Sequence, residues 1–249
     1  ILEGTTHYQE IAQTHKELGT AYAKSGQSSA AISNWEQGQT ILERIGDEHG
    51  AAMIYNNLAI IYYQTDLDRS AAYFGRALET MQRLGDVWGE ATGLMNLGIV
   101  HYGRGDYAQA VDYYQHSLNI KERLGDKQGL AEGHVNLGET FRAQGNLAQA
   151  IVHLEKSHRQ LAVCYLENND PERALASCQE ALQYARETGD RNMEGVIQRI
   201  LGKAYQQQGE MSLAIDHLKQ SVAILSELQT EFTLAPAHRD YGLALAETD

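Results

Sequence analysis

The chain has 249 residues, 43% of them hydrophobic, with two prolines, two cysteines and a formal net charge of −13. This negative charge argues against binding to nucleic acid or to an anionic membrane surface. The cysteines give no disulfide framework, and no apolar run is long enough to span a membrane or to form a signal segment. A cytoplasmic protein is therefore expected.

One sequence pattern returns along the whole chain with a period of 39 to 40 residues. The pattern is Leu-Gly-x2-aromatic, then a Gly-containing turn, then Ala-x3-large. Its clearest copy contains Gly98, the turn at Gly105, and Ala110 with Tyr114; equivalent glycines stand at Gly19 and Gly138. A fixed period of this size is typical of a stacked repeat array.

Each unit of the pattern predicts two amphipathic helices joined by a tight turn. First helices are expected at about 7–25, 47–64, 86–104, 126–144, 158–168, 190–208 and 233–247, and second helices at about 28–45, 67–84, 107–124, 147–157, 171–188 and 211–228. Pro236 suggests that the last helix starts late. Gly-Asp pairs such as Gly85-Asp86 separate the units, because Gly suits a helix end and Asp the start of the next helix.

The spacing inside a unit, which is the same from repeat to repeat, also predicts how its two helices pack. Gly98 has no Cβ, so a partner helix can approach it closely. The second helix offers a small residue, Ala110, and then a large one, Tyr114. Small residues opposite large ones allow the two helices to interdigitate at native density.

These residues resemble the tetratricopeptide repeat (TPR), and the resemblance covers the whole chain. It implies an all-α protein, a right-handed TPR superhelix or α-α solenoid with six units and a seventh first helix. The usual unit has 34 residues, whereas the longer unit here is similar to those of kinesin light chains, Pins-type scaffolds and sensor arms of bacterial regulators. The match of Ile1-Leu2-Glu3 with Ile41-Leu42-Glu43 suggests that the chain starts inside a longer array.

The residues do not form a recognisable catalytic or metal site. Of ten histidines, His101 takes an aromatic packing position, whereas His116, His153 and His217 are expected on solvated faces. Cys164 lies six residues from His158, which is not the spacing of a metal pair on one helix face. We therefore expect no enzyme, no cofactor and no metal.

The resemblance implies that the first helices line a concave groove, and their spacing identifies the residues that face it. The central units offer apolar and aromatic side chains on this arc, whereas the flanking units are basic. The candidate groove residues are Asn56, Tyr63, Met95, Ile99 and Tyr102 in the centre, and Arg142, Arg159, Arg199 and Lys203 toward one end, with Lys16 and Lys24 at the other. A basic stripe on an acidic chain favours an acidic ligand, although chance composition is an alternative explanation.

A row of asparagines precedes the Leu of the repeat at Asn57, Asn96 and Asn136. An amide side chain offers a donor and an acceptor together, which suits the main chain of an extended peptide. The resemblance to kinesin light chain and Pins-type repeats implies this role for the three residues. The alternative is a structural asparagine that bonds a neighbouring helix.

The expected function is a non-enzymatic protein-protein interaction scaffold that binds a peptide segment of a partner in its concave groove. Two alternatives remain open. The array could be a sensor or regulatory arm of a larger signalling protein, or it could be a homo-oligomerisation scaffold.

The repeat count breaks once, between Ser157 and His158. Equivalent residues Gly138 and Ala162 are only 24 apart, so 16 residues of the period are absent. The chain would then be one array at 1–249, with units one to four at 1–157 and units five to seven at 158–249. One explanation is that the molecule holds a segment that the printed sequence lacks, and the intact register on both sides of the break favours it. The other is that two helices are fused into one helix of about 20 residues. A fused helix would hold two half-arrays apart, and a domain-swapped homodimer would cover their exposed faces.

Overall fold

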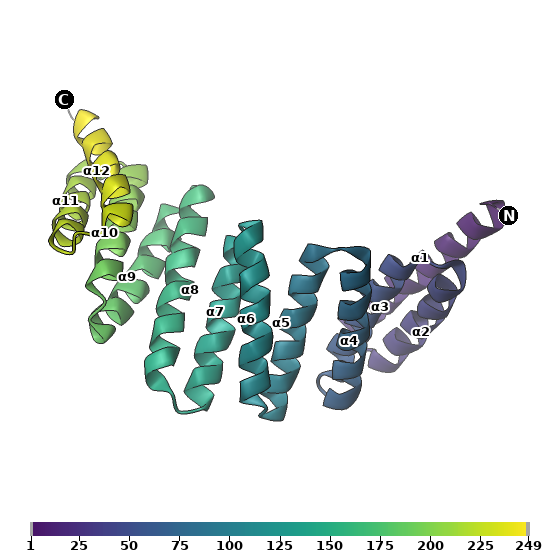
Figure 1. The fold of residues 1–249 in the computed structure, drawn as a ribbon. Coiled ribbons are helices and arrows are strands. Elements are labelled where there is room, and N and C mark those ends of the chain that lie inside the picture. The colour runs from purple at the N-terminus through teal and green to yellow at the C-terminus, as the bar shows by residue number, and fades with distance from the viewer. Residues whose placement is uncertain (1, 248–249) are drawn as a thin grey trace. The chain divides into compact units, whose positions relative to one another are not determined.

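The computed structural model describes residues 2–247, with side chains from His7 onward, so the predicted match of Ile1 lies outside it. This part of the chain holds twelve α-helices and no strand (Figure 1). The helices are α1 (Leu2–Lys24), α2 (Ser28–Ile45), α3 (Glu48–Tyr62), α4 (Leu67–Leu84), α5 (Val87–Arg104), α6 (Tyr107–Leu124), α7 (Lys127–Ala143), α8 (Leu147–Glu167), α9 (Pro171–Thr188), α10 (Arg191–Gln208), α11 (Met211–Glu227) and α12 (Glu231–Ala246). The all-α prediction is confirmed.

The helices form two compact units, unit 1 at Ile1–Ile120 and unit 2 at Lys121–Asp249, with the boundary inside α6. In unit 1 the helices pack in sequence, α1 on α2, α2 on α3, α3 on α4 and α4 on α5. In unit 2, α7 to α12 also pack in sequence, and α10 touches both α8 and α12. The predicted division of one array at position 157 stays a prediction.

Short capped turns set the ends of the helices, as the Gly-Asp pairs predict. Gly85 ends α4 in the left-handed conformation with φ 70°, and the side chain of Asp86 accepts a hydrogen bond from the Gly89 N–H at 2.9 Å. Asp47, Asp126 and Asp190 cap the starts of α3, α7 and α10 in the same way. α12 departs from the prediction, because it begins at Glu231 and contains Pro236 inside the helix.

In four repeats a first-helix glycine contacts a large second-helix side chain, whereas Ala59 and Ala162 stand at the glycine position of the other two. A Cβ added at Gly98 would lie 2.5 Å from Cε1 of Tyr114, and one at Gly138 would lie 2.9 Å from Cγ of Leu154. The Ser117 hydroxyl, three residues after Tyr114, donates to the Ala91 carbonyl at 2.7 Å and ties the two helices together. The predicted packing of Gly98 against Tyr114 is confirmed.

The two helices predicted at 147–157 and 158–168 are a single helix, α8. Its first half packs on α7, where His153 stacks on Phe141, and its second half packs on α9, where His158 stacks on Tyr184. The printed sequence thus folds here as the single helix that the fusion alternative describes, and the other alternative, a segment absent from that sequence, stays a prediction. The expected separation of two half-arrays does not follow, because α8 serves both as the second helix of one repeat and as the first helix of the next.

The fusion leaves polar groups buried in the middle of α8, at a segment that we call the seam, Glu155 to Arg159. Among the described residues, Glu155 Oε1, Ser157 Oγ and Arg159 Nε are buried and have no hydrogen-bond partner. Ser157 is the repeat equivalent of Ser117, yet its hydroxyl makes no matching bond. The nearest charge pair, Arg159 Nε to Glu155 Oε1, spans 3.9 Å, which exceeds a hydrogen bond.

A buried histidine pair lies between α7 and α8, and it corrects the prediction that His153 is solvated. His153 is buried because its ring packs on Phe141, and its Nδ1 lies 3.0 Å from Nδ1 of His134. Burial lowers the pKa of His134 to about 3 and that of His153 to about 4. His217 is likewise half-buried, stacked on Tyr205, whereas His116 is exposed as predicted.

The lowered pKa values predict a loss of stability in acid. The unfolded chain takes up protons below about pH 6.5, whereas the folded pair resists protonation until about pH 4, so the free energy of unfolding falls as pH drops across this window. Between pH 7.5 and pH 5, the free energy of unfolding of a His153→Gln variant should fall by about 2 kcal/mol less than that of the wild type. Urea unfolding at both pH values measures the difference, and parallel losses in the two proteins would contradict a buried neutral pair.

Candidate functional site

An apolar pocket of about 220 Å³ lies on the first helices of unit 1. It is lined by residues of α3 and its C-cap, of α4 and of α5, namely Ile60, Tyr63, Gln64, Phe74, Asn96 and Ile99. Three candidate residues, Tyr63, Asn96 and Ile99, thus meet in one site. Ile60 is 59% exposed, so the pocket has an apolar wall that a ligand can reach.

Two amide side chains have unused hydrogen-bonding groups: Asn96 in the wall of this pocket, and Asn57, which precedes the lining residue Ile60 by about one turn of α3. Asn57 and Asn96 are half-buried, and within the described part of the chain neither side chain has a hydrogen-bond partner. Asn56 Oδ1 is buried and also lacks a partner there. A buried acceptor without a partner costs free energy, so a ligand donor that reached Asn56 Oδ1 would recover it. The half-buried amides of Asn57 and Asn96 can donate to and accept from a peptide main chain.

A second hollow of about 580 Å³ shares the lining residues Tyr63 and Gln64 with this pocket. Gly103 makes room for the shared ring, because a Cβ there would lie 3.1 Å from the Tyr63 hydroxyl. Arg104 closes the far side, where its guanidinium donates to the Leu67 carbonyl at 3.1 Å and to Asp68 at 2.6 Å. Arg104 was not among the predicted groove residues, although its place at the end of a first helix is a usable signal.

The remaining candidates in the centre lie outside the pocket. Met95, predicted on the exposed arc, is only 6% exposed and offers little surface to a ligand. Tyr102 is half-buried, with its ring tilted against that of Tyr107 at 5.7 Å. Asn136 lies on α7 in unit 2, where it is half-buried and already engaged by a neighbour.

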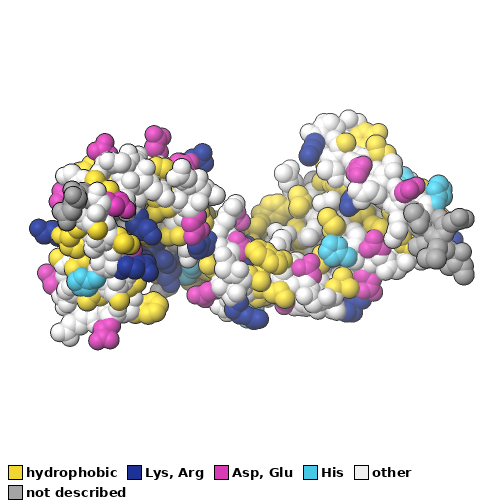
Figure 2. Space-filling model, turned by 90° about the horizontal axis from the view of Figure 1, so that it is seen from above, with side chains coloured by type: hydrophobic (Ala, Val, Ile, Leu, Met, Phe, Trp, Pro, Cys, Tyr) yellow, Lys and Arg dark blue, Asp and Glu magenta, His cyan; other side chains and the backbone are white. Residues whose placement is uncertain are grey.

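Lys and Arg side chains gather over unit 2 (Figure 2), but most of the predicted basic residues there have acidic partners. Arg142 pairs with Glu139, Arg159 lies 3.9 Å from Glu155, and Arg199 lies 3.5 Å from Asp240. Lys203 is exposed and has no ion pair within the described residues. These pairs weaken the case for acidic-ligand recognition by unit 2.

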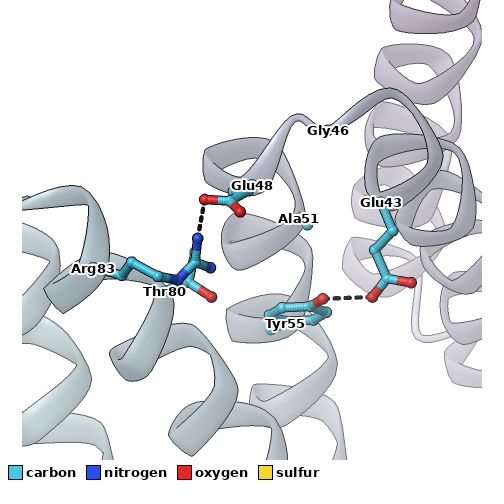
Figure 3. Close-up of a pocket in the computed structure, with 7 residues that line it drawn as sticks. All are labelled: Glu43, Gly46, Glu48, Ala51, Tyr55, Thr80 and Arg83. Atoms are coloured by element: carbon cyan, nitrogen blue, oxygen red, sulfur yellow. Dashed lines mark hydrogen bonds and ion pairs between the residues drawn. The ribbon is translucent and has the colours of Figure 1, made fainter.

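A polar pocket of about 210 Å³ lies elsewhere in unit 1, between α2, α3 and α4 (Figure 3). The Tyr55 hydroxyl donates to Glu43 at 2.5 Å, Arg76 donates to both at 2.9 Å, and Arg83 pairs with Glu48. Burial and the bond to Glu43 raise the pKa of Tyr55 to about 12. The polar groups of this pocket satisfy one another, which fits a structural network.

No group of three or more His, Cys, Asp or Glu side chains in the described part of the chain could hold a metal ion. None of the described helices is long and apolar enough to cross a membrane.

Successive helix pairs with a solvent-accessible pocket on their first helices define a helical-repeat protein, a class that binds ligands on the surface of its stacked helices. The chain belongs to the tetratricopeptide repeat family, whose model matches residues 10–83, 89–160 and 157–227. TPR proteins generally mediate protein-protein interactions and are typically non-enzymatic. No curated protein matches the chain at the level of sequence.

Solved structures with the same fold include two Rap proteins and a signalling ATPase. The apo form of RapI is 14% identical with a TM-score of 0.55, over 95% of this chain and 98% of its own. A Rap protein complexed with Competence and Sporulation Factor is 13% identical with a TM-score of 0.52, over 95% and 75%. The TPR-sensor signal-transduction ATPase of Pyrococcus horikoshii is 16% identical with a TM-score of 0.51, and the match covers 97% of this chain but 44% of that one.

Proposed function

We propose that unit 1 binds an extended peptide segment of a partner protein across α3 and α5. The observation that carries this proposal is the apolar pocket of Ile60, Tyr63, Phe74 and Ile99 with the unpaired Asn96 amide in its wall. An apolar ligand side chain would fill the pocket, while Asn57 and Asn96 hydrogen-bond the peptide main chain. A Rap protein with the same fold was solved complexed with Competence and Sporulation Factor, which supports a binding role for this fold.

The peptide is proposed to carry an acidic residue beside the apolar one. A separate hollow of about 260 Å³ on α1 is lined by Lys16, Thr20 and Lys24, with one acidic residue, Glu17. These lysines have no acidic partner among the described residues, in contrast to the arginines of unit 2. Charge complementarity of this kind increases the rate and the specificity of association.

An Asn57→Ala, Asn96→Ala double variant is expected to bind such peptides more weakly by about 1–3 kcal/mol, because each amide loses a hydrogen bond in a partly desolvated site. Ligands would be selected on the wild-type protein from a random-sequence peptide library, and their affinities measured by fluorescence anisotropy. Ile60→Asp should abolish binding, since it places a charge in the apolar wall.

Asn119→Ala, an exposed asparagine on α6 away from the pocket, is the matched control and should leave affinity unchanged. The Tm of the double variant should stay close to that of the wild type. Unchanged affinity in that variant would refute the proposed role of the two amides, and a fall of many degrees in Tm would assign them a structural role.

A second candidate function is a sensor or regulatory arm of a larger signalling protein. The fold likeness to the TPR sensor of the P. horikoshii ATPase favours it. In this case the peptide site of unit 1 would receive the signal. Measuring the activity of a full-length signalling protein that contains this array, with and without peptide, would test it.

A further inference from the structure

Three arginines occupy the same repeat position on α8, α10 and α12. They are Arg159, Arg199 and Arg239, each 40 residues after the one before. Because α10 packs against both α8 and α12, these three helices form one layer of unit 2, and the arginines follow one another across it. We call the three residues the arginine row, and Lys and Arg side chains are seen to gather over this unit (Figure 2).

A carboxylate bridges the last two members of the row. Asp240 Oδ2 lies 3.5 Å from Arg199 Nη1, and Asp240 Oδ1 lies 3.3 Å from Arg239 Nε. Asp240 is only 7% exposed, so its carboxylate is enclosed beside the two guanidinium groups. Charge-assisted bonds of this kind are among the stronger hydrogen bonds in proteins. The bridge therefore shows what two neighbouring arginines of the row can hold between them, namely one carboxylate.

The step from Arg159 to Arg199 has no counterpart of Asp240. Polar contacts between neighbouring helices of this layer join residues that are 41 apart in the sequence. The pairs are Arg199 with Asp240 across α10 and α12, and Gln207 with the Leu166 carbonyl across α10 and α8. By this register the residue that corresponds to Asp240 one step earlier is Ile200, which carries no charge. A carboxylate between Arg159 and Arg199 must therefore come from another molecule.

Arg159 is short of acceptors in the folded chain. Its Nε is buried and has no hydrogen-bond partner among the described residues, and Glu155 Oε1, with which it forms a long ion pair, lies 3.9 Å away. Burial raises the pKa of Glu155 to about 7, so at neutral pH this carboxyl group offsets the charge of Arg159 only in part. A guanidinium group in this state gains more from an arriving carboxylate than one that is already paired.

Two lysines add to the positive charge around the row. Lys156 on α8 and Lys203 on α10 each lie about one turn from an arginine of the row, and neither has an ion pair within the described residues. The row and these lysines together carry more positive charge than Glu155 and Asp240 can offset. On a chain with a net charge of −13, this layer is therefore a local surface that attracts acidic groups.

We propose that the arginine row binds an acidic segment of a partner protein, and that one of its carboxylate side chains bridges Arg159 and Arg199 in the way that Asp240 bridges the next pair. Packed helices lie about 8–10 Å apart, and an extended chain advances about 3.3 Å per residue. Acidic residues at about every third position therefore match the spacing of the row. The row lies on α8, α10 and α12 of unit 2, so this proposal stands or falls separately from the peptide site of unit 1.

The probe is a fluorescein-labelled peptide of repeated Glu-Gly-Gly triplets, titrated against the full chain by anisotropy at low ionic strength. Saturable binding is expected, and the same peptide with Gln in place of Glu should not bind. Arg159→Gln should weaken binding at least about tenfold, because it removes one side of the bridge. The matched control is Arg142→Gln on α7, outside the row, where the arginine pairs with Glu139. It removes the same charge and should bind like the wild type.

A second variant is expected to bind the probe more tightly. Asp240→Asn keeps the shape of the side chain but removes the carboxylate that engages Arg199, so affinity should rise at least about threefold. Asp216→Asn, at an exposed position of α11, makes the same change of charge and should leave affinity unchanged. Thermal unfolding of every variant shows that it is folded before it is titrated.

Equal affinities of the Arg159→Gln and Arg142→Gln proteins would overturn the proposal, because the peptide would then respond to overall charge and not to the row. Binding of the Gln peptide, or weaker binding by a folded Asp240→Asn protein, would overturn it as well. A single-stranded RNA of the same net charge provides the last comparison. If it binds as tightly as the Glu peptide, the row recognises polyanions in general, and the assignment to an acidic protein segment is wrong.

Discussion

Gly98→Leu is expected to lower the free energy of unfolding by about 3 kcal/mol or more. The Cβ alone would lie 2.5 Å from the Tyr114 ring, which is itself fully enclosed at the contact of α5 and α6. A leucine adds three more carbon atoms in the same place. Because Tyr114 has no free space to move into, the helices must separate, and the Ser117 to Ala91 hydrogen bond would be strained with them.

Chemical denaturation followed by circular dichroism measures this change. Gly75→Leu on α4 provides the control, since it makes the same substitution in the middle of a helix with open space around it. The control should be neutral or slightly stabilising, because glycine is a poorer helix former than leucine. Equal stability of the two variants would show that the glycine contact does not determine how α5 and α6 pack.

Glu155→Gln is expected to stabilise the protein increasingly as pH rises. Glu155 is 5% exposed, and burial raises the pKa of its carboxyl group to about 7, against the opposing effect of Arg159. The unfolded chain ionises this group near pH 4.5, so the folded state carries no penalty in acid and the full penalty above pH 7. Between pH 5 and pH 8, the free energy of unfolding of the variant should rise by about 2 kcal/mol relative to that of the wild type.

The measurement is the free energy of unfolding of both proteins at the two pH values. Comparing variant with wild type at each pH removes the contribution of the histidine pair, which is present in both. Glu79→Gln on α4 makes the same substitution at an exposed position and is the control for the chemical change itself. A constant difference between wild type and Glu155→Gln would mean that Glu155 ionises normally in the folded protein.

The helices, their caps and the contact at Gly98 could be predicted because each depends on residues near one another in the sequence. A Gly-Asp pair ends one helix and starts the next whatever lies beyond it. Likewise, Gly98 and Tyr114 belong to one helix pair, so the repeat pattern contains both sides of the contact. The pocket residues Tyr63, Asn96 and Ile99 followed from the same helical periodicity.

The features that were missed depend on neighbours that periodicity does not reveal. Met95 was placed on an exposed arc of its own helix, but burial depends on what packs against that arc. His153 has a polar side chain on an outward position, yet Phe141 and His134 of the preceding helix enclose it. The acidic partner of Arg199 is Asp240, 41 residues later, and no local pattern selects that pair.

The shared helix α8 changes the direction of the repeats that follow it. In a regular array one second helix separates successive first helices, so all first helices run the same way. Here α7, α8, α9 and α10 pack in succession through short turns, with α8 filling two roles, so α10 and α12 run opposite to α7. α10 also packs against α8 and α12, so these three helices form one row that runs in a single direction, and their positive amino ends share one edge of unit 2.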